Sequence, residues 1–189
     1  MAKNITLASG SPRRRQLLKM AGIHFTVESG NVPELVPDSV PPEKRSQFLA
    51  EMKAAAMSVS RPKDIVIGAD TSVFCEGRMM GKPKTKEEAK EMLRFLSGKV
   101  HTVYTGVCLI YSEEEAESFT SATKVEFYPL TEEEIEAYVQ SGEPMDKAGA
   151  YGIQGLGCTL VKRIEGDYST VVGLPVAEVV RRLRAHGAR

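Results

Sequence analysis

The chain has 189 residues, of which 42% are apolar, and its 25 basic residues balance its 25 acidic ones. This length fits one domain, or one domain with lobes, and the apolar fraction is enough for a core. The zero net charge speaks against a broad electrostatic grip on a nucleic-acid backbone, so any phosphate site must be local.

Two further classes of protein are not indicated. The cysteines at 75, 108 and 158 are far apart and form no CxxC pair, so neither a zinc knuckle nor a disulfide framework is expected. Cys75, Cys108 and Cys158 are interpreted as small reduced core residues. Because no apolar run is long enough for a signal peptide or a membrane span, we expect a cytoplasmic protein.

A short strand and a helix open the chain. Residues 5–8 are expected to form the strand, and the helix begins at Pro12 and ends near Gly22. Ser11 fits the N-cap position, and Pro12 fits the first helical position, where its missing N–H costs nothing.

Three arginines, residues 13–15, crowd the first turn of this helix. That turn is the positive end of the helix dipole, where basic side chains are slightly unfavourable. A bound anion is the simplest reason for placing them there. The N–H groups of Gly10 and Ser11, the hydroxyls of Ser9 and Ser11, and Arg13 can converge on a phosphate. An ordinary helix start with solvated arginines is the alternative.

A strand over residues 25–28 and a Pro-rich loop over 31–42 lead to a second helix, over 42–59. Its apolar residues are spaced to share one buried face. They are Phe48, Leu49, Met52, Ala55, Ala56 and Val59. Lys53 follows Met52, so it emerges at the edge of that face, either as a snorkelling surface lysine or as a site residue.

The β-branched run over residues 64–70 predicts a buried central strand that ends at Asp70 and Thr71. Ligands of open α/β sheets collect at the carboxyl ends of strands, and the small residues Gly68 and Ala69 leave room there. Asp70 is therefore a candidate metal ligand or general base. A turn-capping aspartate is the alternative.

A hairpin over residues 71–80 follows and delivers Lys82, which the next residue, Pro83, keeps out of helical geometry. Capping boxes at Thr85 and at Thr131 each start a helix, of which the second ends at Gly142. The first helix is expected to bury Ala89, Met92, Leu93 and Leu96, and the second Ile135, Tyr138 and Val139. Between these helices, two β-rich runs cover 101–110 and 118–128.

Glycine is densest over residues 146–157, which lets the backbone approach a ligand closely. The stretch lacks the GxGxxG dinucleotide fingerprint, and a glycine-rich connection without a ligand is the alternative. Strands are expected over 159–164 and 168–172, and a last helix begins at Leu174 and Pro175.

Several segments together carry a family resemblance that covers nearly the whole chain. They are Ala8-Ser9-Gly10-Ser11-Pro12-Arg13-Arg14, Ile67-Gly68-Ala69-Asp70-Thr71, Gly81-Lys82-Pro83, Leu96-Ser97-Gly98 with His101, residues 143–155 and Val172-Gly173-Leu174-Pro175. In this series the chain resembles the Maf family of nucleotide pyrophosphatases.

The resemblance implies a single domain over residues 1–189 with an α/β fold similar to the inosine-triphosphate pyrophosphatases. In that fold a mixed, strongly bent sheet is flanked by helices, and two lobes enclose a central cleft. It also implies a hydrolase, dependent on Mg²⁺ or Mn²⁺, that cleaves a nucleoside triphosphate between its α and β phosphates. The products are the monophosphate and pyrophosphate.

Within the family, one branch acts on dTTP and UTP and another on 7-methyl-GTP. Arg13, Thr71 and Gln154 match the first branch, whereas the second typically has Trp, Gln and Glu at these places. The Gln154 amide can pair with the N3–H and O4 of uracil or thymine. Cytosine inverts that pattern and would leave buried groups unpaired, at roughly 1–3 kcal/mol each.

The resemblance also assigns roles to residues. Asp70 is the catalytic residue, and Glu34 and Asp70 are expected to hold the metal. The groups expected to contact the phosphates are Ser9, Gly10, Ser11, Arg13, Lys53 and Lys82. The acidic loop, Val32-Pro33-Glu34, departs from the two adjacent acidic residues of many relatives.

The expected partner is a small nucleotide, with no stable nucleic-acid complex and no membrane association, and a homodimer is allowed for. The cellular task implied by the family is removal of non-standard pyrimidine nucleotides, with a link to cell-division arrest. Two alternatives stay open: a 7-methyl-GTP pyrophosphatase, and a non-catalytic regulator of septum formation that binds nucleotide or nucleic acid.

Overall fold

The structure is a computed structural model that describes residues 3–188. The strands are β1 (Ile5–Leu7), β2 (Thr26–Val27), β3 (Ile65–Cys75), β4 (Arg78–Met80), β5 (Val100–Ile110), β6 (Ala116–Phe127) and β7 (Val161–Glu165). The α-helices are α1 (Pro12–Met20), α2 (Pro42–Ser60), α3 (Lys86–Leu96), α4 (Glu132–Gln140), α5 (Tyr168–Val172) and α6 (Val176–Ala185). Three 3₁₀ turns fill the glycine-rich region: η1 (Glu143–Asp146), η2 (Ala148–Ala150) and η3 (Gly155–Thr159).

The strands form one mixed sheet in the order β2-β1-β3-β5-β6-β7, with β4 paired to β3. Strand β1 runs parallel to both β2 and β3, whereas β4 is antiparallel to β3 and β7 is antiparallel to β6. The expected α/β class and mixed sheet are therefore confirmed.

The chain divides into two compact units. Unit 1 contains the residues up to Asp70, Thr105–Ser121 and the residues from Gly173 on; unit 2 contains Thr71–Tyr104 and Ala122–Val172. The chain first passes from unit 1 to unit 2 between Asp70 and Thr71, inside the continuous strand β3. The sequence predicts that this strand ends at Asp70, but β3 continues to Cys75 because the hairpin pairing with β4 extends it.

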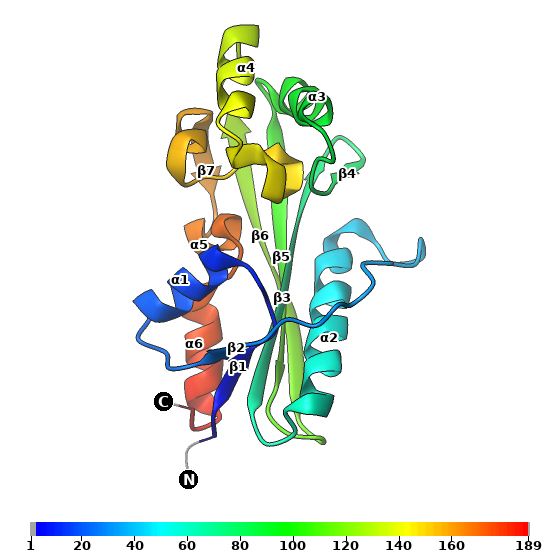
Figure 1. Cartoon of the computed structure of the whole chain (residues 1–189), viewed down its shortest axis with the longest axis vertical. Helices are drawn as coiled ribbons and strands as arrows, with labels where there is room; N and C mark the ends of the chain where they lie inside the picture. The colour runs from blue at the N-terminus through cyan, green and yellow to red at the C-terminus, as the bar shows by residue number, and fades with distance from the viewer. Residues whose placement is uncertain (1–2, 189) are drawn as a thin grey trace. The chain divides into compact units, whose positions relative to one another are not determined.

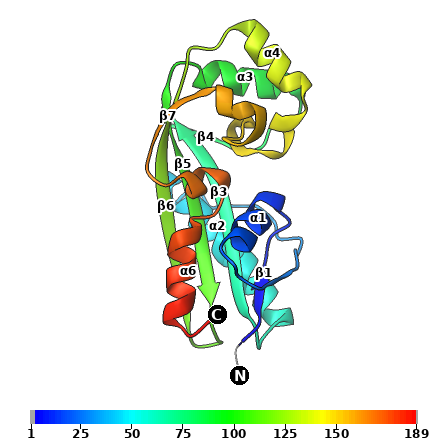
Figure 2. The ribbon, with the colours of Figure 1, turned by 90° about the vertical axis from the view of Figure 1, so that its left-hand side faces the viewer.

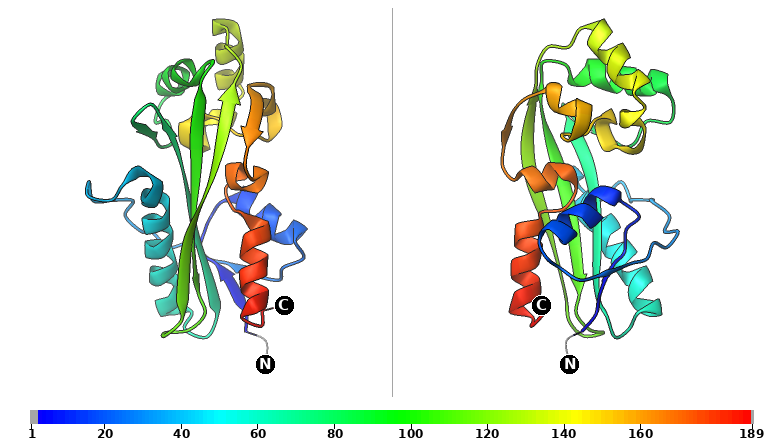
Figure 3. Two further views of the ribbon diagram at one scale, coloured as in Figure 1. Left: turned by 180° about the vertical axis from the view of Figure 1, so that it is seen from behind. Right: turned by 60° about the vertical axis from the view of Figure 1, so that its left-hand side comes forward.

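In unit 1, helix α2 covers one face of the sheet, and α1 and α6 cover the other (Figures 1 and 3). Two glycines let α2 approach very closely. A Cβ at Gly68 would lie 2.2 Å from the carbonyl oxygen of Ala50, and one at Gly106 would lie 2.1 Å from the backbone nitrogen of Gln47. Such distances exclude any side chain, so glycine at these positions sets the depth at which the helix packs.

The predicted buried face of α2 is wrong. Its buried residues are Ser46, Ala50, Ala54 and Met57. The larger apolar residues that the spacing favoured lie outward: Val59 is 83% exposed, Ala55 and Ala56 are exposed, and Phe48, Leu49 and Met52 are only partly buried. Opposite the two glycines the sheet leaves no room for large side chains, so the helix turns Ser46, Ala50 and Ala54 inward there, and the larger Met57 is buried farther along the helix.

In unit 2, helices α3 and α4 lie on the same side of the strands (Figure 2). They bury the residues expected of them: Ala89, Met92, Leu93 and Leu96 from α3, and Ile135, Tyr138 and Val139 from α4. The Thr131 capping box is complete, whereas at Thr85 the Glu88 carboxylate bonds to the N–H of Lys84 instead of the N–H of Thr85.

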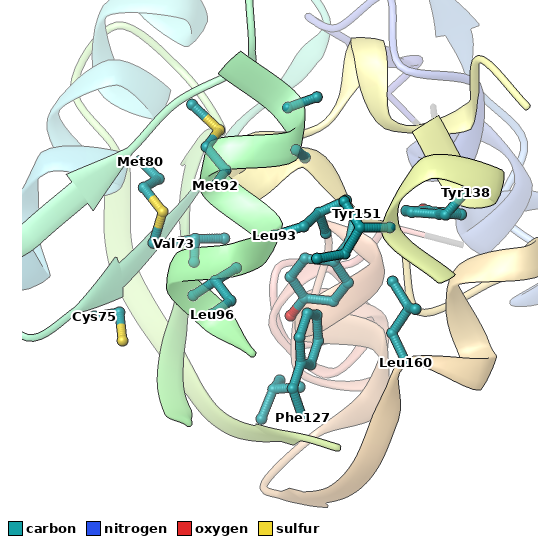
Figure 4. Close-up of a cluster of buried hydrophobic side chains, with 14 of the residues drawn as sticks. Val73, Cys75, Met80, Met92, Leu93, Leu96, Phe127, Tyr138, Tyr151 and Leu160 are labelled. Atoms are coloured by element: carbon teal, nitrogen blue, oxygen red, sulfur yellow. The ribbon is translucent and has the colours of Figure 1, made fainter. Parts of the chain in front are cut away.

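An aromatic group lies in the core of unit 2, where Figure 4 shows Phe127 and Tyr151 side by side. The His101 ring lies edge-on to both rings, and its Nε2 is 2.7 Å from the hydroxyl of Tyr151. His101 is buried, its Nδ1 has no hydrogen-bond partner within residues 3–188, and burial lowers its pKa to about 4. The imidazole is therefore neutral at neutral pH.

Two further expectations fail. Residues 168–172 form helix α5 rather than a strand, because the Asp167 carboxylate caps it by accepting hydrogen bonds from the N–H of Thr170 and the hydroxyls of Ser169 and Thr170. Cys158 is exposed, although Cys75 and Cys108 are buried as expected. None of the helices within residues 3–188 has the length and apolar character needed to cross a membrane.

Candidate active site

The position of Asp70 follows from the alternation of side chains along β3. Successive residues of a strand point to opposite faces, so Val66, Gly68 and Asp70 share one face. Gly68 lies against Ala50 and Ala54 of α2, so this is the face that α2 covers. Asp70 thus lies on the helix-covered face, two residues beyond Gly68, where α2 approaches β3 closely.

Lys53 of α2 joins two carboxylates. Its Nζ lies 2.6 Å from Oδ1 of Asp70 and 2.9 Å from Oε1 of Glu34. The side chains of Lys53 and Asp70 are only 18% and 13% exposed, whereas that of Glu34 is 55% exposed. Segments 34, 53 and 70, which the sequence nominated separately, therefore meet in unit 1.

The fold anchors the side chain of Arg14 from two sides. It donates from Nη1 to Oγ of Ser9 at 2.9 Å and from Nε to the carbonyl oxygen of Gly173 at 2.8 Å. Burial lowers the pKa of its guanidinium, and the negative charge of Asp70 opposes that shift. Arg14 is thus a cation held in the electrostatic field of Asp70 and Glu34.

The predicted phosphate loop precedes α1 as expected. Ser11 is the N-cap, and its side chain accepts a hydrogen bond from the N–H of Arg14. The hydroxyl of Ser9 accepts from the N–H of Ser11 and from Arg14, so both hydroxyls help to order the loop. Gly10 is exposed, and Arg13 is half-buried in the first helical turn.

The remaining predicted site residues, Thr71, Lys82 and Gln154, belong to unit 2. Lys82 is exposed, and Thr71 and Gln154 are half-buried. The carbonyl oxygen of Gly81 accepts a hydrogen bond of 3.0 Å from the N–H of Gly149. This bond joins the Lys82 segment to the glycine-rich stretch that carries Gln154.

A protein-family model matches nearly the whole chain. The model of the Maf family, described as "Maf-like protein", matches residues 4–186. This chain belongs to the Maf family. A relative from Bacillus cereus (strain G9842), named dTTP/UTP pyrophosphatase, is 51% identical over 182 residues, which cover 96% of this chain and 95% of the relative. One from Bacillus pumilus (strain SAFR-032) with the same name is 48% identical over 97% of this chain and 96% of its own length.

Solved structures agree with this Maf protein in fold. A HAM1 protein from Coxiella burnetii superposes with a TM-score of 0.50 at 13% sequence identity, covering 97% of this chain and 99% of that one. The likeness concerns the fold alone.

The carboxylates of Glu34 and Asp70 are the candidate metal ligands of this Maf protein. Among residues 3–188, no group of three or more His, Cys, Asp and Glu side chains is placed to hold a metal ion. Glu34 and Asp70 nevertheless direct two carboxylate oxygens at one cation, the ammonium of Lys53. A pair of carboxylates fits Mg²⁺, which binds one or two of them and completes its shell with water and substrate phosphate.

Sequence reasoning missed the anchored role of Arg14 in this Maf protein, although a signal was present. Arg14, Leu17 and Leu18 are spaced i, i+3 and i+4, so they share a helical face, and both leucines are buried. An arginine on the same face as two core leucines is directed inward rather than into solvent.

Proposed function

We propose that this Maf protein hydrolyses dTTP and UTP between the α and β phosphates, releasing the nucleoside monophosphate and pyrophosphate. The observation that carries the proposal is the cluster of Lys53 with Asp70 and Glu34, in which a carboxylate able to act as base lies against cationic groups. The relatives named dTTP/UTP pyrophosphatase, about half identical along nearly the whole chain, support the choice of substrate.

The phosphates bind at the start of α1 in this proposal. Free N–H groups at a helix N-terminus favour an anion, and Arg13 adds a charge beside the loop of Ser9 to Ser11. Lys53 contacts the phosphates from α2, and Lys82 is a further phosphate contact. Cations aimed at oxygens whose negative charge grows in the transition state lower the barrier.

Asp70 is the general base. Its Oδ1 is fixed at 2.6 Å from Nζ of Lys53, which orients the carboxylate. It accepts a proton from the water that attacks the α phosphorus, and pyrophosphate leaves with the electrons of the broken P–O bond. General-base catalysis typically contributes ~10²–10⁴ in rate.

Glu34 and Asp70 would hold the divalent cation, Mg²⁺ or Mn²⁺. When bound, such an ion offsets charge on phosphate oxygens and orients the attacking water. Lys53 already contacts both carboxylates, so its ammonium is placed to turn from them to the substrate's phosphate.

Gln154 selects the base. A glutamine amide offers an acceptor to N3–H and a donor to O4 of uracil or thymine, whereas cytosine presents the inverse pattern. Thr71 and Arg13 are the two other positions assigned to substrate choice.

The proposal is tested by hydrolysis of UTP in ¹⁸O-labelled water with Mg²⁺, with the products identified by mass. We expect the label in UMP and unlabelled pyrophosphate, and an Asp70→Asn variant that still binds UTP but has lost at least about 100-fold in kcat. Formation of UDP and phosphate would contradict the proposed bond cleavage. Near-normal turnover by Asp70→Asn would remove Asp70 from the role of base.

A further inference from the structure

Both carboxylate oxygens of Glu143 accept hydrogen bonds from the backbone in the later part of the glycine-rich stretch. Oε2 accepts a hydrogen bond of 2.9 Å from the N–H of Leu156, and Oε1 accepts one of 3.0 Å from the N–H of Gly157. The hydroxyl of Tyr138 donates to Oε1 at 2.9 Å. These donors, helped by the charge of Lys147, hold the pKa of Glu143 below its usual value although burial acts in the opposite direction.

Tyr138 extends this contact to the other side of Gln154. Its buried hydroxyl, which donates to Glu143, also accepts a hydrogen bond of 3.0 Å from the N–H of Gly152. The backbone is therefore held two residues before Gln154 and again two and three residues after it. We call Tyr138 and Glu143 together the clasp.

The glycines of the stretch are needed for the clasp to close. Gly155 has a φ of +64°, and a Cβ there would lie 2.6 Å from Oε2 of Glu143. A Cβ at Gly157 would lie 2.7 Å from the Tyr138 hydroxyl and 2.0 Å from the carbonyl oxygen of Gly152. The backbone thus approaches the two polar side chains more closely than any other residue type permits.

None of the hydrogen bonds of the clasp involves the side chain of Gln154. A carboxylate that accepts two backbone N–H groups and a hydroxyl fixes the course of the chain, because each of these donors would be left unpaired if the chain moved. A specificity residue that reads hydrogen bonds needs such support, since its amide must be held within about 0.5 Å of the productive position.

We infer that Tyr138 and Glu143 are positioning residues for base selection, which hold Gln154 in the orientation that favours uracil and thymine over cytosine. This inference rests on the proposed function, in which Gln154 contacts the base. Neither clasp residue touches the substrate; both act through the backbone of residues 152–157.

The test uses the full chain with the variants Glu143→Gln and Tyr138→Phe. A glutamine at 143 presents an amide N–H₂ where one backbone N–H needs an acceptor, and phenylalanine at 138 removes the acceptor of the Gly152 N–H. For each variant we expect KM for UTP to rise about 10-fold, kcat to stay within about 3-fold, and the UTP-to-CTP ratio of kcat/KM to fall about 10-fold. Glu133→Gln, an exposed carboxylate in the first turn of α4, is the matched control and should leave the ratio unchanged.

A structural role alone would give a different result. Partial unfolding lowers kcat for every nucleotide equally and leaves the UTP-to-CTP ratio intact, and that outcome overturns the inference. Gln154→Ala distinguishes a failure of the clasp inference from a failure of the proposed role of Gln154. If it lowers the ratio while both clasp variants do not, the clasp inference fails and the proposed function stands. If Gln154→Ala also leaves the ratio unchanged, base selection by Gln154 fails and the clasp inference fails with it.

Discussion

Lys53 links the two carboxylates of the candidate site. Its ammonium lies within 3 Å of both Asp70 and Glu34, so it fixes the two carboxylates and offers a charge to the phosphates. We expect Lys53→Met to lower kcat for UTP about 100-fold or more, the range measured when one transition-state donor is removed. Steady-state kinetics with UTP and Mg²⁺ measures the effect.

Lys63→Met is the control for this change, because Lys63 is an exposed lysine of unit 1 on the turn before β3. It should turn over UTP normally. A Lys53→Met variant with unchanged kcat would show that the ion pair only fastens α2 to the sheet.

His101 makes the stability of the protein depend on pH. Its pKa is about 4 in the folded chain and about 6.5 in an unfolded one. As pH falls below 6.5 the unfolded chain binds a proton that the folded chain does not, so stability is full above that pH and is lost towards pH 4. At about 1.4 kcal/mol per pKa unit, the loss approaches roughly 3 kcal/mol.

Urea unfolding at pH 7.5 and at pH 5 measures the part of this loss that is expected by pH 5, about 2 kcal/mol, and His101→Gln should remove most of it. The exposed His186 provides the control, because His186→Gln should keep the acid sensitivity. An equal loss on acidification in His101→Gln and the unchanged chain would mean that other groups cause it.

The sequence predicts which residue types form the site but not which neighbour holds them. The pattern nominated Asp70 as a strand-end carboxylate and Lys53 as a lysine at the edge of a helix face; the structure brings the two together, although β3 continues past Asp70. The sequence does not predict the hydrogen bond from Arg14 to the carbonyl oxygen of Gly173. The two residues are 159 positions apart, and a backbone carbonyl carries no sequence signal. The clasp on residues 152–157 was missed for the same reason.

At the scale of elements, the packing of α2 on the sheet depends on two glycines. A methyl group at Gly106 would lie 2.1 Å from the nitrogen of Gln47 and 2.3 Å from its Cα. Both are backbone atoms, so the helix must move. We expect Gly106→Ala to lower the free energy of unfolding by about 1–3 kcal/mol, the usual cost of overpacking, as measured by urea denaturation.

Gly30→Ala is the matched control, because a Cβ there meets nothing within 4 Å. It should change stability by less than about 1 kcal/mol. If Gly106→Ala is as stable as Gly30→Ala, α2 does not pack as closely as the distances state.

The element-level errors share one cause, which is that a local pattern was outweighed by a tertiary or capping interaction. The apolar spacing of α2 favoured Val59 as a core residue, but the close approach at Gly68 and Gly106 admits only alanine-sized residues and the helix is rotated accordingly. The β-branched residues after Asp167 favoured a strand, but one carboxylate that caps three donors starts a helix. Helices α3 and α4 were predicted correctly because their apolar faces and caps agree.

At the scale of the whole molecule, the α/β class followed from alternating strand and helix patterns, and the family from motifs spread over nearly the entire chain. The division of β3 between two units at Asp70 and Thr71 had no counterpart in the sequence. Hydrophobic periodicity reports local burial, and a long strand that serves two cores keeps the same periodicity throughout. The homodimer stays a prediction.

Substrate binding should stabilise the whole chain, since a ligand that binds only the folded state shifts unfolding by mass action. With α,β-methylene-UTP, in which the bond to be cleaved is replaced, at 100 times its Kd, the gain is about 2.7 kcal/mol. For a protein of this size that corresponds to a rise in Tm of roughly 5–10 °C.

Differential scanning calorimetry with Mg²⁺ measures this rise in Tm, and chelation of the metal should remove most of it. Without the metal, Glu34 and Asp70 would face the phosphates uncompensated. An equal rise in the presence of chelator would therefore contradict a role for the metal in nucleotide binding. Asp70→Asn should retain part of the rise with the analogue, because the change removes one of the two proposed metal ligands and leaves Glu34 together with the arginines and lysines proposed to hold the phosphates.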